Sequence, residues 1–184
     1  MAPLTPSQTV GPFFHFGLAC TPPDGPPADV AGERIRIEGQ VRDGGGAPVS
    51  DALLEFWQAD ASGHYAHPDD PGAVLPGVFD GFARVATDAD GRFVLVTIKP
   101  GRVPAPDGST QAPHLLVGVL ARGLLQRLIT RVYFEGEPSN DADAILRLVP
   151  EARRGTLLAR AAGDGHFRFD IVLQGVAETV FFDV

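Results

Sequence analysis

The stretch RIRIEGQVRDGGGAPVSDALLEFWQ, residues 34–58, decides the predicted fold. In its first part Ile35, Ile37 and Val41 fall on one face and charged residues on the other, the period-two pattern of a half-buried β-strand over residues 34–41. The glycine-rich run at residues 43–48 supplies the positive-φ positions of a turn. Residues 53–58 then predict the returning strand, so the core begins as β-structure.

More strands are predicted by apolar runs rich in β-branched and aromatic residues at residues 92–98, 114–121, 126–134, 169–173 and 178–182, and by a hairpin at residues 160–168. Only residues 141–149 resemble a helix, with Ile145, Leu148 and Val149 on one side and Pro150 ending it. The predicted fold is therefore an all-β sandwich with long surface loops and at most one short helix.

The size of the chain fits one domain. Its 184 residues are 44% hydrophobic and 21% charged, which is enough apolar material for one core. Proline-rich polar segments at residues 22–31 and 67–76 are interpreted as surface loops. We expect a single domain over residues 1–184, in which residues 1–33 form an N-terminal arm and loop that dock on a partner and residues 34–184 form the core.

Charge and composition exclude several classes of protein. The formal net charge is −8, from 15 basic and 23 acidic residues, which argues against binding to nucleic acid. With one cysteine, Cys20, the chain can form neither an intrachain disulfide nor a thiolate metal cluster. The first residues do not match a signal peptide and no apolar run is long enough for a membrane span, so we expect a cytoplasmic protein with no membrane partner.

Two blocks of sequence resemble a known enzyme family. The first covers residues 39–65 and ends in the motif EFWQADASGHY, residues 55–65. The second runs through GFARVATD at residues 81–88, TIKPG at residues 97–101 and APH at residues 112–114. In order and spacing these blocks resemble the intradiol ring-cleaving dioxygenases, whose activity is the insertion of O2 between the two hydroxylated carbons of a catechol.

The resemblance implies a ferric ion held by two tyrosinates and two histidines, because hard anionic oxygen suits a trivalent cation. Tyr65 matches the first tyrosine ligand and His114 the first histidine. Val103 and Leu116 stand at the positions of the other two ligands and have no donor atom. We therefore expect no catalytic residue and no bound Fe(III) in this chain alone, and interpret Tyr65 and His114 as a hydrogen-bonded remnant of a metal site. The arginine that the family places three residues before the first histidine is replaced by Gln111.

The resemblance also implies a role for a chain that binds no iron. A subunit without iron would pair with an iron-bearing beta subunit in a hetero-oligomer, and would complete the pocket for protocatechuate and O2, which react to 3-carboxy-cis,cis-muconate. The implied substrate-binding residues are Thr9, Gly11 and Pro12 of the N-terminal arm, together with Arg131. A carboxylate that enters a closed pocket needs a donor to replace its water, which suits an arginine.

Two alternatives remain open at this point. The chain could be an autonomous intradiol dioxygenase with an altered ligand set, in which Tyr65 and His114 recruit unusual partners. It could also be a non-enzymatic interaction module, because the motifs around Asp43 and Asp88 occur in transthyretin-like folds as well. The other histidines show no ligand spacing and are predicted to lie at the surface: His15, His64, His67 and His166.

Overall fold

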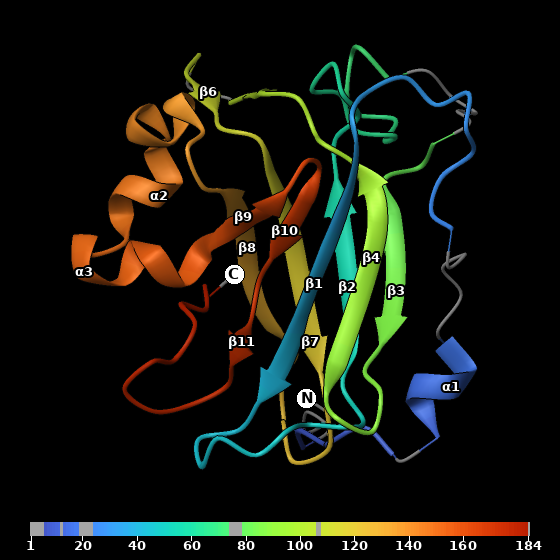
Figure 1. The fold of residues 1–184 in the computed structure, drawn as a ribbon, viewed down its shortest axis with the longest axis vertical. Helices are drawn as coiled ribbons and strands as arrows, with labels where there is room; N and C mark the ends of the chain where they lie inside the picture. Colours follow the sequence, from blue (N-terminus) through green and yellow to red (C-terminus); the bar gives the residue numbers. More distant parts are fainter. Residues whose placement is uncertain (1–5, 12, 19–23, 74–78, 106–107, 184) are drawn as a thin grey trace, which may run out of the picture.

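The computed structural model describes residues 6–11, 13–18, 24–73, 79–105 and 108–183. Its strands form two layers that pack face to face (Figure 1). The elements of the first layer are β3 (Phe82–Ala86), β2 (Leu53–Gln58), β7 (His114–Leu120) and β8 (Leu128–Phe134). Those of the second are β4 (Arg92–Ile98), β1 (Arg34–Arg42), β10 (His166–Arg168), β9 (Leu158–Gly163) and β11 (Ile171–Val172).

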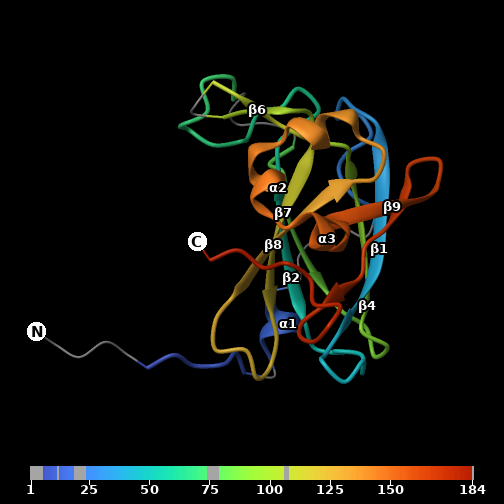
Figure 2. The same cartoon turned by 90° about the vertical axis from the view of Figure 1, so that its left-hand side faces the viewer.

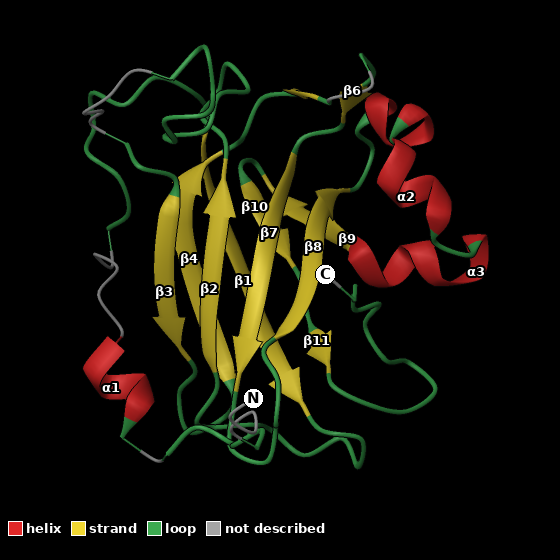
Figure 3. Ribbon diagram, turned by 180° about the vertical axis from the view of Figure 1, so that it is seen from behind, coloured by secondary structure: helices red, strands yellow, loops and turns green. Residues whose placement is uncertain are grey.

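Most neighbouring strands in the two layers are antiparallel, and parallel pairing of β8 with β9 joins the layers into one nine-stranded sheet within the described residues. Figure 3 shows the first layer in front and β4, β1 and β10 behind it. The short pair β5 (Val103–Pro104) and β6 (Thr110–Gln111) lies at one end. The all-β sandwich that the sequence predicts is confirmed.

The core lies between the layers and follows the predicted alternation. Ile35, Ile37 and Val41 of β1 are buried, as expected from their period-two spacing. From the other layer Phe56 packs against Phe93 of β4, with ring centroids 6.0 Å apart. On the outer face of the first layer Tyr133 is covered by Leu146 and Leu157, whereas Leu116 and Arg131 are only partly buried, so a site can lie beside them.

Helical structure is short and is divided among more segments than the one that the sequence predicts. In the described residues these are α1 (Phe14–Leu18), η1 (Pro138–Ala142), α2 (Ala144–Leu148), α3 (Glu151–Arg154) and η2 (Gly155–Leu157). Pro150 separates α2 from α3 because proline cannot continue a helix. Leu146 is the buried residue of α2, whereas Leu148, expected on the buried side, is exposed. None of the described helices is long and apolar enough to cross a membrane.

The prediction of a strand at residues 178–182 is wrong. The segment makes only an isolated bridge between Phe182 and Ile129. Thr179 is turned inward, where its hydroxyl accepts a hydrogen bond from the Val172 amide at 3.0 Å. Further along β8, Tyr133 already pairs with both β7 and β9, so that part of the strand has no edge left for a regular partner.

Candidate functional site

Tyr65 and His114 lie together at one end of the first layer. His114 is the first residue of β7 and is 2% exposed, and Tyr65 lies in the loop that follows β2. The Tyr65 hydroxyl is 3.5 Å from Nε2 of His114, at the long limit of a hydrogen bond. The two residues therefore form the adjacent pair that the sequence predicts.

The loop that carries Tyr65 is organised by Asp70. Its carboxylate accepts hydrogen bonds from the Tyr65 amide at 2.7 Å and from the Gly72 amide at 2.9 Å, and Nδ1 of His64 lies 3.1 Å away. These amide bonds hold the pKa of Asp70 below its usual value. The Tyr65 ring packs on Trp57, with centroids 5.2 Å apart. No sequence motif marked Asp70 for this role.

Both members of the pair are neutral near pH 7. Nδ1 of His114 donates to the Ala112 carbonyl at 2.8 Å, which leaves Nε2 as the acceptor facing Tyr65. Burial, assisted by the charge of Arg131, lowers the pKa of His114 from 6.5 to about 4. Burial raises the pKa of the Tyr65 phenol. The pair therefore offers no anionic oxygen.

The positions of the two other expected ligands are aliphatic. Val103 is 6% exposed and pairs with Gln111 across the β5–β6 strands. Leu116 lies on the same outer face as His114, in register with Trp57 on one side and Arg131 on the other. In the described part of the chain no group of three or more His, Cys, Asp or Glu side chains is placed to hold a metal ion. These residues do not fit a ferric site, because one phenol and one imidazole are only half of the expected donors and could supply at most one negative charge to a trivalent ion.

Arg131 lies close enough to the pair for its charge to act on both Tyr65 and His114. It projects from β8, and its Nη1 donates to Oε1 of Gln111 at 2.7 Å and to the Tyr133 hydroxyl at 3.3 Å. Tyr133 in turn donates to Oδ1 of Asp143 at 3.1 Å. The sequence pointed to Arg131 but gave no role to Tyr133 or Asp143. For Asp143 the available signal was its position just before the apolar residues of α2, which is typical of an N-cap.

The part of the N-terminal arm around Thr9 lies at the opposite end of the layer. The Thr9 hydroxyl accepts a hydrogen bond from the Gly123 amide at 2.8 Å and donates to the Ala121 carbonyl at 3.4 Å. Gly11 is exposed, and Pro12 falls outside the described residues. Figure 2 shows the first described residues running out from the lower end of the strands.

Thr9 and Arg131 are thus not brought together in one chain. Arg131 pairs with Leu116 of β7, whereas Thr9 contacts Ala121, five residues further along the chain. Five residues of a strand span roughly 16 Å, which is the separation between the two contacts along β7. A single catechol cannot contact Thr9 and Arg131 of the same copy across that separation. A pocket that contains both Thr9 and Arg131 must therefore combine residues of two chains.

Comparisons with known proteins identify the family of the chain. A family model described as Dioxygenase matches residues 19–175. The chain is 48% identical over 200 residues to the protocatechuate 3,4-dioxygenase alpha chain of Burkholderia cepacia, which covers 98% of this chain and 97% of that relative. It is 38% identical to the protocatechuate 3,4-dioxygenase beta chain of the same species, over 95% of this chain and 77% of that relative.

Among solved structures, the dioxygenase domain of a carbohydrate-binding fusion protein from Streptomyces sp. SirexAA-E aligns with a TM-score of 0.62 and 30% identity, covering 94% of this chain and 100% of that chain. The interpretation as a non-enzymatic transthyretin-like module is set aside, because the similarity to dioxygenases extends over nearly the whole sequence. Iron in the ferric state is the cofactor of such enzymes, although the donors of this chain do not suit it. On its sequence and its fold, the chain belongs to the intradiol ring-cleaving dioxygenase family.

Proposed function

We propose that this chain is the alpha subunit of a protocatechuate 3,4-dioxygenase and that it completes the substrate pocket of an iron-bearing beta subunit. The assembled enzyme would insert O2 between the two hydroxylated carbons of protocatechuate and release 3-carboxy-cis,cis-muconate. The relatives named alpha and beta chains belong to an enzyme built from two kinds of chain, and this chain is similar to both. The absence of any need for a disulfide fits a cytoplasmic enzyme.

The observation that carries the proposal is the incomplete set of donors around His114. Tyr65 and His114 are adjacent and neutral, while Val103 and Leu116 offer only carbon at the other two ligand positions. A subunit that keeps the fold but lacks half of the ligands needs another chain to supply the metal. We therefore assign Fe(III) to the beta subunit.

Arg131 is the residue that we assign to the carboxylate of protocatechuate. An anion that leaves water for a closed pocket needs a cation or several donors, and a guanidinium can offer two parallel N–H groups to a carboxylate. Arg131 is partly buried and lies on the outer face of the first layer, where another chain could pack against it. Its side-chain hydrogen bonds within the described residues go to Gln111 and Tyr133, which are both neutral, so they do not cancel its charge.

The arm is assigned to the same assembly. We propose that residues 1–33 dock on the beta subunit as an arm and loop, with Thr9, Gly11 and Pro12 at its pocket, and that residues 34–184 form the single core domain. Thr9 anchors the arm to the β7 end, and beyond it Phe13 is 76% exposed. A mostly exposed aromatic side chain on a terminal segment is typical of a surface that packs against a partner.

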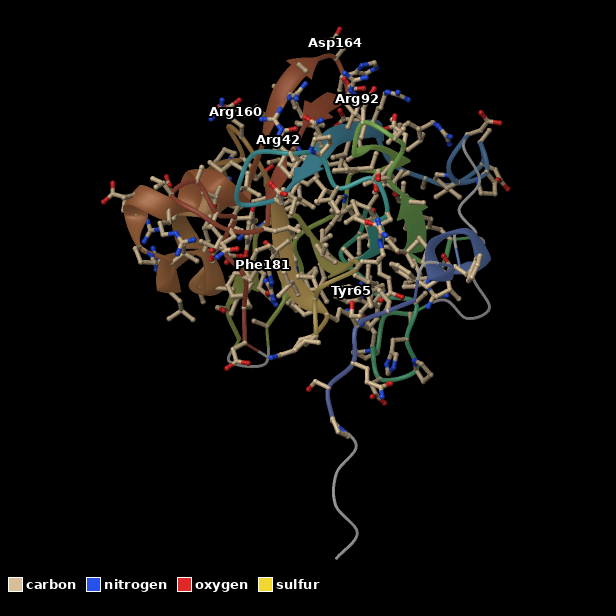
Figure 4. All side chains as sticks on the ribbon, turned by 90° about the horizontal axis from the view of Figure 1, so that it is seen from below. Arg42, Tyr65, Arg92, Arg160, Asp164 and Phe181 are labelled. Atoms are coloured by element: carbon tan, nitrogen blue, oxygen red, sulfur yellow. The ribbon has the colours of Figure 1, made fainter. Side chains whose placement is uncertain are left out.

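The test is reconstitution. The chain is expressed alone and together with a candidate beta chain, and iron content and oxygen uptake with protocatechuate are measured. We expect both only with the beta chain present. Arg131→Ala in the assembled enzyme should raise KM for protocatechuate about tenfold or more, by loss of a charged hydrogen-bond donor. The matched control is Arg160→Ala, an exposed strand arginine that Figure 4 shows well apart from Tyr65. Equal kinetics for the two variants would contradict the role of Arg131.

A further inference from the structure

The guanidinium of Arg131 is anchored at one corner only. Both of its hydrogen bonds to described residues start from Nη1, one to Gln111 at 2.7 Å and one to Tyr133 at 3.3 Å. Nη1 has two N–H groups, so these two acceptors use both of them. Nε and Nη2 make no hydrogen bond to any described residue. They form the edge of the guanidinium that can hold a carboxylate with two parallel bonds.

Tyr133 is a fixed acceptor for Arg131. Its ring is 0% exposed, and its hydroxyl donates to Oδ1 of Asp143, which leaves the oxygen lone pair toward Arg131. Burial raises the pKa of Tyr133, so the hydroxyl keeps the proton that this arrangement needs. The hydrogen bonds therefore have one direction, from the guanidinium to the phenol and from the phenol to the carboxylate.

Asp143 is itself held in place by backbone. It is 0% exposed, and it accepts hydrogen bonds from the Ala112 amide and from the Leu146 amide, both at 2.8 Å. The first amide belongs to the segment just before β7 and the second to α2. The position of the Tyr133 hydroxyl is thus set by two elements outside its own strand, as an oriented catalytic or binding group requires.

Gln111 is the second acceptor for Arg131, and the absence of a charge on its side chain is what allows this contact. It stands where other members of the family have an arginine, and its neutral amide oxygen accepts from Arg131. A guanidinium at residue 111 would lie against that of Arg131 and repel it, because like charges at contact distance are unfavourable. The loss of one arginine therefore makes room for the other.

We propose that Gln111 and Tyr133 are positioning residues, which fix Nη1 of Arg131 so that its Nε–Nη2 edge faces the carboxylate of the substrate. The inference rests on the proposed function of Arg131 as the partner of that carboxylate. Neither residue needs to touch the substrate. They act on the recognition of a carboxylated catechol. A guanidinium that rotates freely must be ordered before it can form two parallel hydrogen bonds, and that ordering weakens binding.

The test uses the assembled enzyme with Tyr133→Phe and Gln111→Leu. Each variant removes one acceptor and nearly preserves side-chain volume. We expect KM for protocatechuate to rise about three- to tenfold with kcat within about twofold of wild type. The affinity for a catechol without a carboxylate, measured as substrate or competitive inhibitor, should stay unchanged. In an Arg131→Ala background the two substitutions should have no further effect on KM.

Tyr65→Phe is the matched control, because it removes a phenol from the same cluster but no recorded hydrogen bond of Arg131. Its KM should equal that of wild type. If Arg131→Ala raises KM while Tyr133→Phe and Gln111→Leu do not, the positioning inference is wrong and the proposed function stands. If Arg131→Ala itself leaves KM unchanged, the assignment of Arg131 to the substrate carboxylate fails. Thermal unfolding of each assembly identifies any variant that has lost its fold. Gln111→Glu, whose carboxylate would cancel the charge of Arg131 and repel the substrate anion, should bind protocatechuate no better than Gln111→Leu.

Discussion

Replacement of Asp143 tests the network beneath Arg131 at the point where it is most constrained. The carboxylate is buried and accepts three hydrogen bonds: from the Tyr133 hydroxyl at 3.1 Å and from the amides of Ala112 and Leu146 at 2.8 Å each. Asp143→Ala leaves all three donors without this acceptor. Two of them, the Ala112 amide and the Tyr133 hydroxyl, belong to residues that are fully buried.

The expected loss follows from those three bonds. A buried donor left unsatisfied costs about 1–3 kcal/mol, and loss of a helix N-cap costs about 1 kcal/mol. We expect Asp143→Ala to lower the free energy of unfolding by about 3–5 kcal/mol, which for a chain of this size corresponds to a drop in melting temperature of roughly 10 °C. Asp143→Asn keeps an acceptor for Tyr133 but turns an N–H toward the Ala112 amide, so its cost should be roughly half.

The assay is thermal unfolding of the assembled enzyme at neutral pH. Asp141→Ala is the matched control, because Asp141 is an exposed aspartate two residues away. It should change the melting temperature by less than about 2 °C. If Asp143→Ala unfolds within about 2 °C of Asp141→Ala, the carboxylate is not the fixed point of the network and the reasoning on Tyr133 loses its support.

Two further predictions concern the other residues of the site and the arm. The pKa of His114 is about 4 in the folded chain and near 6.5 when unfolded, so the unfolded state binds more protons between these values. Stability should therefore be complete above pH 6.5 and fall by roughly 3 kcal/mol as the pH drops toward 4. His114→Gln should flatten this part of a plot of melting temperature against pH, and an unchanged slope would contradict the assignment. Thr9→Ala removes the anchor of the arm on Gly123 and should raise KM for protocatechuate a fewfold with little change in melting temperature, whereas wild-type kinetics would contradict a role for the arm.

The sequence predicts most of the sandwich because alternation is a local signal. β1, β2 and β4 match the predicted strands to within one residue, since each has buried residues at every second position. The segment at residues 178–182 has the same composition but not the same outcome. Whether a chain segment pairs depends on a free neighbouring edge, and β8 has already used much of its edges on β7 and β9.

The site was predictable only in part, for a similar reason. Resemblance to the family identified Tyr65, His114 and the two aliphatic replacements, which are properties of single positions. The link from Arg131 through Tyr133 to Asp143 depends on packing of β8 against α2, which neither composition nor periodicity records. Likewise the separation of Thr9 from Arg131 arises from the direction of β7 and could not be read from motifs.

The central claim is that this chain keeps the fold of an iron dioxygenase but leaves the metal to its partner. The most direct measurement is the ratio of iron to protein in the purified assembly, with chain amounts determined separately. The account predicts one iron atom for each pair of alpha and beta chains, and loss of all iron when the ligands of the beta chain are replaced. Two iron atoms per pair, or iron that remains after that replacement, would contradict it.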